Sequence, residues 1–152
     1  MNLDHLYYQF HLTSKALEYN LEGISDEEAL DQPGNGGNCI NWLVGHIIAS
    51  RDTYYMQLGR DALLPESKRE RYDRGSQPVS AGDEIYRLSE LFQYFEKSNK
   101  TFQDLFENFS EKRITLSSEQ VNELAGILFH EAYHVGQVAI VRRTLGKEGV
   151  IK

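Results

Sequence analysis

Hydrophobic residues recur every three or four positions along most of this chain, which is the spacing of one face of an α-helix. The first periodic stretch covers about residues 3 to 21 and stops before Gly23. A second begins after Asn38, which we expect to be its N-cap, and closes at Gly59. These patterns predict two long helices, each with one apolar face.

The segments around the second helix lack this period. Ser25 and Glu28 have the spacing of a capping box and predict a short helix, and a glycine-rich turn follows over residues 31–38. Residues 60–82 are charged, contain two prolines and two glycines, and hold no lasting period. A loop of this length inside a domain is often functional or mobile.

Two further helices are predicted in the second half of the chain. Ser80 with Asp83 resembles a helix start, and Ser117 or Ser118 is expected to cap a last helix that runs to Gly146. The third helix carries an aromatic-rich stripe made of Ile85, Leu88, Phe92, Phe95, Phe102, Phe106 and Phe109. Four long helices without a strand pattern predict an all-α fold, a four-helix bundle.

Length and charge narrow the class of protein. A chain of 152 residues fits one domain, which we expect to span residues 1–152. The net charge of −7 argues against a nucleic-acid or anionic-membrane partner. No stretch resembles a signal peptide or approaches the eighteen or so apolar residues of a membrane helix. With the lone Cys39, these features favour a cytoplasmic protein.

Three histidines carry the candidate chemistry. His130 and His134 are four residues apart and therefore lie on one face of the last helix. His46 lies within the apolar pattern of the second helix, so all three side chains are expected to point inward. Three imidazoles can hold one divalent metal ion and leave a coordination position open, which is typical of a catalytic site.

Glu131 completes an H-E-x-x-H motif with these histidines, but the other parts of a metalloprotease are missing. The only carboxylate after His134 is Glu148, beyond the expected helix end. A di-iron bundle needs a second E-x-x-H element, and the sequence has none. Glu131 lies one residue off the ligand face, which leaves solvent exposure, support of the ligands and a general base all open. Gln137 either orients a histidine or the bound species, or covers the bundle end.

Two segments resemble the DinB superfamily. They are N-C-I-N-W-L-V-G-H at 38–46 and H-E-A-Y-H-V-G-Q at 130–137. The resemblance implies a four-helix bundle of the up-down-down-up type, with one divalent ion on His46, His130 and His134. Nickel or zinc is expected first, and iron or manganese also fits. Known members include transferases and isomerases that use low-molecular-weight thiols.

The resemblance and the histidines together predict a metal-dependent enzyme with a small-molecule substrate. The favoured reaction transfers a low-molecular-weight thiol to an electrophile, at a site rimmed by residues 60–82. A metal-dependent hydrolase and a non-catalytic, metal-binding stress-response protein remain alternatives. The aromatic content also makes a homodimer a reasonable expectation.

Overall fold

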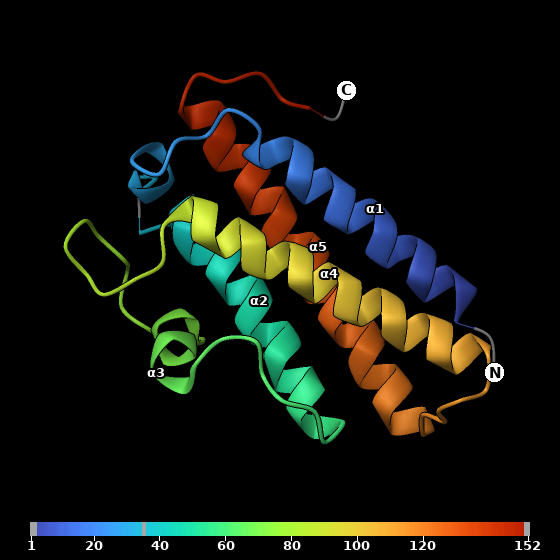
Figure 1. The fold of residues 1–152 in the computed structure, drawn as a ribbon. Helices are drawn as coiled ribbons and strands as arrows, with labels where there is room; N and C mark the ends of the chain where they lie inside the picture. Colours follow the sequence, from blue (N-terminus) through green and yellow to red (C-terminus); the bar gives the residue numbers. More distant parts are fainter. Residues whose placement is uncertain (1–2, 35, 151–152) are drawn as a thin grey trace.

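The computed structural model describes residues 3–34 and 36–150, so Asn35 of the expected turn and both chain ends lie outside it. Every long element within the described residues is a helix, and these residues contain no strand (Figure 1). The long helices are α1 (Asp4–Leu21), α2 (Ile40–Gln57), α4 (Leu88–Ser110) and α5 (Ser118–Thr144). The short α3 (Glu66–Arg69) and two 3-10 turns (Glu28–Leu30 and Glu70–Tyr72) lie in the connections. The predicted all-α class is confirmed.

The four long helices pack side by side, with α5 against both α1 and α2, and α2 against α4 (Figure 1). Hydrogen bonds tie their ends together. The Asn41 amide, at the start of α2, donates to the Tyr86 carbonyl just before α4 at 2.8 Å. The Tyr54 hydroxyl, near the end of α2, donates to the Gln120 carbonyl in the first turn of α5 at 3.0 Å. The contact between α2 and α5 is what brings the two histidine motifs together.

Helix α5 begins at its predicted N-cap, whereas the N-cap of α2 lies one residue after the predicted one. The Ser117 hydroxyl accepts from the Gln120 N–H at 3.1 Å, and the Gln120 side chain accepts from the Ser117 N–H at 2.8 Å. At α2, the N-cap is Cys39 rather than Asn38, because the first helical hydrogen bond runs to the Cys39 carbonyl from the Leu43 N–H. Asn38 was therefore the wrong cap by one residue.

The third long helix begins later than the sequence suggested. We expected a start at Ser80, but α4 begins at Leu88. The Asp83 carboxylate accepts hydrogen bonds from the Ser80 N–H at 2.8 Å and from the Arg71 guanidinium at 2.7 Å. These bonds close a turn and fasten it to the preceding loop, so the capping-like spacing marks a turn instead of a helix.

The Ser25–Glu28 capping box is present as predicted. The Glu28 carboxylate accepts from the Ser25 N–H at 2.8 Å, and the Ser25 hydroxyl accepts from the Glu28 N–H at 3.1 Å. The short helix that it opens is a single 3-10 turn, Glu28–Leu30, rather than a full α-helical segment.

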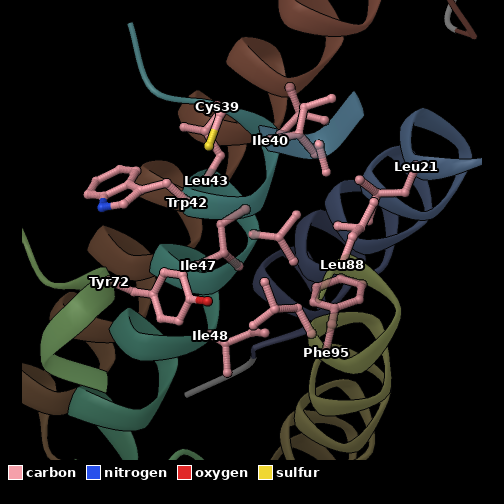
Figure 2. Packing of buried hydrophobic residues seen from close by; sticks show 14 of the residues in the cluster. Leu21, Cys39, Ile40, Trp42, Leu43, Ile47, Ile48, Tyr72, Leu88 and Phe95 are labelled. Carbon is pink, nitrogen blue, oxygen red and sulfur yellow. The ribbon is translucent and has the colours of Figure 1, made fainter. Parts of the chain in front are cut away.

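The first half of α2 is buried on every side, because residues 60–82 cross its outer face. Leu64, Tyr72 and Val79 of this segment are all buried. Asp52 anchors the segment by accepting hydrogen bonds from two backbone N–H groups, those of residues 63 and 64. Figure 2 shows the Tyr72 ring against one flank of α2, while the core with α4 lies on the other. The irregular segment is therefore a packed cover over α2.

Helix α5 is the one helix in the described part of the chain that is long and apolar enough to cross a membrane, judged by length and composition alone. This differs from the sequence expectation that no stretch approaches that composition. Only 39% of the relevant window is buried inside the structure. A single such helix is weak support for a membrane span, because the core helix of a bundle passes the same test.

Candidate metal centre

The structure brings together all three histidines singled out in the sequence. His46 comes from the middle of α2, and His130 and His134 from successive turns of α5. The Nε2 atom of His130 lies 3.2 Å from Nε2 of His46 and 2.9 Å from Nε2 of His134. The ligand atoms of the three residues all lie within 4.8 Å of one another. Three ring nitrogens therefore face one point between the two helices.

The ring of His46 is held by the segment that covers α2. Its Nδ1 donates a hydrogen bond to the Tyr72 carbonyl at 2.6 Å, so Nε2 carries the lone pair. The Trp42 indole stacks on the same ring, with centroids 4.5 Å apart and planes 16° apart. Both contacts fix the ring plane, and they aim Nε2 at the other two histidines.

The Tyr72 ring explains why the residue before His46 is a glycine, Gly45. A Cβ at this position would lie 2.2 Å from Cδ1 of the Tyr72 ring, which no real contact allows. The bare backbone lets the Tyr72 ring lie directly on α2. The carbonyl of the same tyrosine is then close enough to accept from His46. The W-x-x-G-H motif thus combines a stacking partner, a gap for a covering ring and a ligand.

His134 is held from its own helix. Its Nδ1 donates to the Gln137 side-chain oxygen at 2.6 Å, which leaves the Nε2 lone pair free. The Gln137 amide nitrogen in turn donates to the Tyr133 hydroxyl at 3.3 Å, which fixes the orientation of the amide. The i, i+3 spacing of His134 and Gln137 makes this contact available on one helix face. Gln137 thus orients a candidate ligand, in line with one of its two predicted roles.

The donor set fits a divalent ion. Burial lowers the pKa of all three histidines, which favours neutral rings near pH 7. Nε2 of His46 and Nε2 of His134 each carry a lone pair. A proton on Nε2 of His130 can form a hydrogen bond to only one of these two nitrogens. A cation would satisfy all three, and the separations of 3.2 and 2.9 Å from Nε2 of His130 suit nitrogens roughly 2.0–2.1 Å from one ion.

Residues 9–138 match the model of the DinB superfamily. The chain belongs to the DinB superfamily. The matched range contains His46, His130 and His134, together with Gln137. No curated protein matches the sequence. Family membership and the geometry of the cluster both fit a metal-binding DinB-family protein.

Glu131 in this DinB-family chain is not at the surface, so the solvent-exposed interpretation was wrong. It is 1% exposed, and its two carboxylate oxygens accept from the Arg51 guanidinium at 2.9 and 2.5 Å. Arg51 is itself fully buried and also donates to the side chains of Ser14, Ser98 and Asn99. The carboxylate is thus part of an ion pair between α2 and α5, one residue from a candidate ligand.

The sequence reasoning missed Arg51. It lies in the apolar pattern of α2, between Ile48 and Tyr54, at a position that faces the core. A cation at a core position requires an anionic partner. An arginine within the apolar pattern of a helix therefore indicates a buried carboxylate on a neighbouring helix. Glu131 is the one acidic residue within the apolar stretch of α5.

Residues 60–82 lie beside the histidine cluster, where we expected them to form the rim of the site. Besides the Tyr72 carbonyl, this segment supplies the Ser76 hydroxyl, which accepts from the Trp42 indole N–H at 2.8 Å. After burial, the positive charge of Arg74 is a further cause that lowers the pKa of both His46 and His130. The charge of this loop residue therefore acts on two of the three candidate ligands.

Proposed function

We propose that this DinB-family protein binds one divalent metal ion through His46, His130 and His134 and transfers a low-molecular-weight thiol to an electrophile. The observation that carries the proposal is the convergence of three Nε2 atoms, with two rings held through Nδ1 by built-in acceptors. Nickel and zinc suit three imidazoles best, and iron or manganese is the next choice. We place the protein in the cytoplasm, where small thiols are kept reduced.

Each part of the site has a role in this proposal. When bound, the ion supplies a positive charge that three neutral imidazoles leave uncompensated, which favours an anionic ligand such as a thiolate. The Tyr72 carbonyl and Gln137 keep the rings of His46 and His134 in their tautomers. We assign to Arg74, whose charge acts on His46 and His130, the binding of an acidic group of the thiol. Trp42, only 5% exposed, shields one face of the cluster from water.

The half-buried His130 leaves the cluster accessible from one side, and this opening also suits a water molecule. A metal-dependent hydrolase is therefore the second candidate, since the same positive charge activates water. The nearly complete burial of His46 and His134 favours the third candidate, a non-catalytic metal-binding protein.

Metal binding is tested first, by elemental analysis of protein purified without an affinity tag. We expect about one transition-metal ion per chain in the wild type and none in His130→Ala, because two imidazoles hold the ion far less well. His11→Ala is the matched control, since His11 is exposed on α1 and outside the cluster. Metal-free wild type that takes up neither nickel nor zinc would reject the proposed site.

Thiol transfer is tested with metal-loaded protein, a panel of low-molecular-weight thiols and monochlorobimane as the electrophile. We expect metal-dependent conjugation with at least one thiol and none in His130→Ala. Arg74→Gln should raise KM for an acidic thiol more than it lowers kcat. Hydrolysis of ester substrates without any conjugation would favour the hydrolase. A loaded protein inactive in both assays would favour the non-catalytic alternative.

We also propose that the bundle has the up-down-down-up order of its family. The start of α2 is bonded close to the start of α4, and the end of α2 to the start of α5. Rings of α1 near its start, Tyr7 and Phe10, contact Phe106 near the end of α4. These contacts support α2 and α4 running in one direction and α1 and α5 in the other.

A further inference from the structure

The outer face of α5 is apolar and exposed over most of its length. Phe129, Tyr133 and Ile140 are 72%, 59% and 65% exposed. Small residues fill the spaces between them, namely Gly126, Ala132 and Gly136, all exposed. Between Glu123 and Arg142 the helix has one charged residue, Glu131, and that residue is buried in its ion pair. We call this surface, made of the residues at 126, 129, 132, 133, 136 and 140, the α5 outer face.

The spacing of this face is that of a helix-pairing seam. Positions 126, 129, 133, 136 and 140 are separated by three, four, three and four residues, as the core positions of a coiled coil are. The packing partners α1 and α2 occupy the other sides of α5. A Cβ built at Gly126 or Gly136 meets no atom within 4 Å, so both glycines leave open hollows on the surface.

We propose that the α5 outer face binds a second copy of this chain, with the two α5 helices antiparallel about a two-fold axis near Tyr133. In this register Ile140 of one copy lies opposite Gly126 of the other. In the same register Phe129 lies opposite Gln137 of the other copy, next to Gly136. Each large side chain thus lies opposite or next to a hollow, and the surface is complementary to itself, as a two-fold interface requires.

Charge selects the antiparallel arrangement. In a parallel pair, Glu123 would face Glu123 and Arg143 would face Arg143. In the antiparallel pair centred near Tyr133, Glu123 lies opposite Arg143 of the second copy, at both ends of the seam. Like charges that face each other across an interface are unfavourable, and opposite charges fix the register.

A membrane is the other occupant that such a face suggests, but the charge of the chain disfavours it. The net charge is −7, and anionic lipid surfaces repel an acidic protein. The helix is also fixed in the bundle by the buried Arg51–Glu131 pair. A second copy carries the matching apolar face and the matching charges, so we commit to a homodimer.

The size of the face sets the expected affinity. A seam of about 20 residues is roughly 30 Å long at 1.5 Å per residue. A strip of that length and one helix wide covers on the order of 300 Å², less than the roughly 800 Å² per partner of a standard interface. We therefore expect a weak dimer that dissociates on dilution.

The dimer does not depend on the proposed reaction, but it adjoins the histidine cluster. Tyr133 at the axis accepts a hydrogen bond from Gln137, which holds His134. The partner's α5 would consequently lie beside the residues that orient one candidate ligand.

The first experiment is light scattering of the full chain over a concentration series that spans the micromolar range. We expect a monomer–dimer equilibrium in the wild type and monomers for Phe129→Asp and Ile140→Asp, with unchanged circular dichroism because both side chains are exposed. Leu12→Asp is the control, because Leu12 is a comparably exposed apolar residue on α1. Wild type that stays monomeric at several hundred micromolar, or a Leu12→Asp variant that dissociates equally, would overturn the proposal.

Disulfide cross-linking tests the direction of the pair. We expect Tyr133→Cys to form a cross-linked dimer under mild oxidation, because the two copies of this residue meet at the axis. Ile140→Cys should not, since its two copies would be roughly 20 Å apart and a disulfide needs Cα atoms within about 7 Å. The native Cys39 is buried and stays out of the reaction. Equal cross-linking at both positions would indicate a parallel pair, and a monomer that co-sediments with anionic vesicles would assign the face to lipid.

Discussion

Gly45 is the residue on which the position of His46 most directly depends. Its missing side chain lets the Tyr72 ring lie on α2, and the Tyr72 carbonyl then accepts from Nδ1 of His46. The effect on the ligand is indirect, because the glycine itself touches no histidine nitrogen. One absent methyl group thus determines whether a loop residue can orient the imidazole.

Gly45→Ala is expected to lower both stability and metal affinity. The new Cβ would lie 2.2 Å from the Tyr72 ring, so the covering segment must shift, and overpacking of this kind costs about 1–3 kcal/mol. The check is urea denaturation together with a metal titration. Gly126→Ala is the matched control, since no atom lies within 4 Å of its Cβ and helix propensity predicts a gain of about 1 kcal/mol. Equal gains in both variants would contradict the packing role of Gly45.

Cys39 is expected to be inert in the folded protein. It is fully buried, and burial raises the pKa of its thiol, so at any given pH the reactive thiolate is rarer than in a free cysteine. Ellman's reagent at pH 8 should detect no thiol in the native chain and one after unfolding in urea. Tyr8→Cys, at an exposed position on α1, should react at once. Rapid labelling of native wild type would contradict the buried position.

At the scale of elements, the contact between α2 and α5 decides where the candidate ligands meet. Two features span it, the histidine cluster and the Arg51–Glu131 ion pair. Glu131 follows His130 directly, so the bond that holds its carboxylate also limits the rotation of α5 about its axis. The Arg51 guanidinium lies about 5 Å from the ring centres of Phe10, Phe95 and Phe102, which encloses it within three aromatic side chains. We infer that the ion pair helps to set the helix register at the metal centre.

Arg51→Met is expected to destabilise the fold by about 3–5 kcal/mol, because it leaves the buried Glu131 charge without a partner. The double variant Arg51→Met with Glu131→Leu should recover much of this loss, since it removes both charges. Chemical denaturation of the two variants measures the difference. The half-exposed Arg71–Asp83 pair supplies the control, and Arg71→Met should cost less than about 1 kcal/mol. A double variant as unstable as the single one would show that packing dominates.

At the scale of the whole molecule, the candidate centre joins residues 84 positions apart in the chain. His46 on α2 and the histidines on α5 are close only when the bundle is assembled. A metal ion that needs all three would therefore bind the folded state far better than the unfolded one. Binding and folding are then coupled through the same helices.

Added metal is consequently expected to stabilise the protein. At a free concentration 100 times the Kd, the gain is about 2.7 kcal/mol. Thermal unfolding with nickel or zinc, compared with chelator-treated protein, should show a higher midpoint with metal. His46→Ala should show no such shift, whereas His5→Ala, exposed and outside the cluster, should behave as wild type. A shift of the same size in His46→Ala would point to binding elsewhere.

The parts that could be predicted from the sequence share one property: their signal is local. The apolar periods predicted the long helices, and the Ser117 cap and the i, i+4 pair His130–His134 follow from short spacings. The errors arose where a spacing typical of one local structure belongs to a different one. Ser80 and Asp83 have the spacing of a helix start, yet Asp83 bonds to Arg71 and closes a turn.

The sequence by itself determined the all-helical class, the family and the three histidines, because periodicity and motif spacing act within a few turns of one helix. Only the tertiary structure decided the environment of those histidines. The Tyr72 carbonyl on His46 lies 26 residues away, and the Arg51–Glu131 pair joins residues 80 apart. No spacing rule relates such distant positions, since they meet through helix packing. The burial that requires these partners exists only once the bundle has formed.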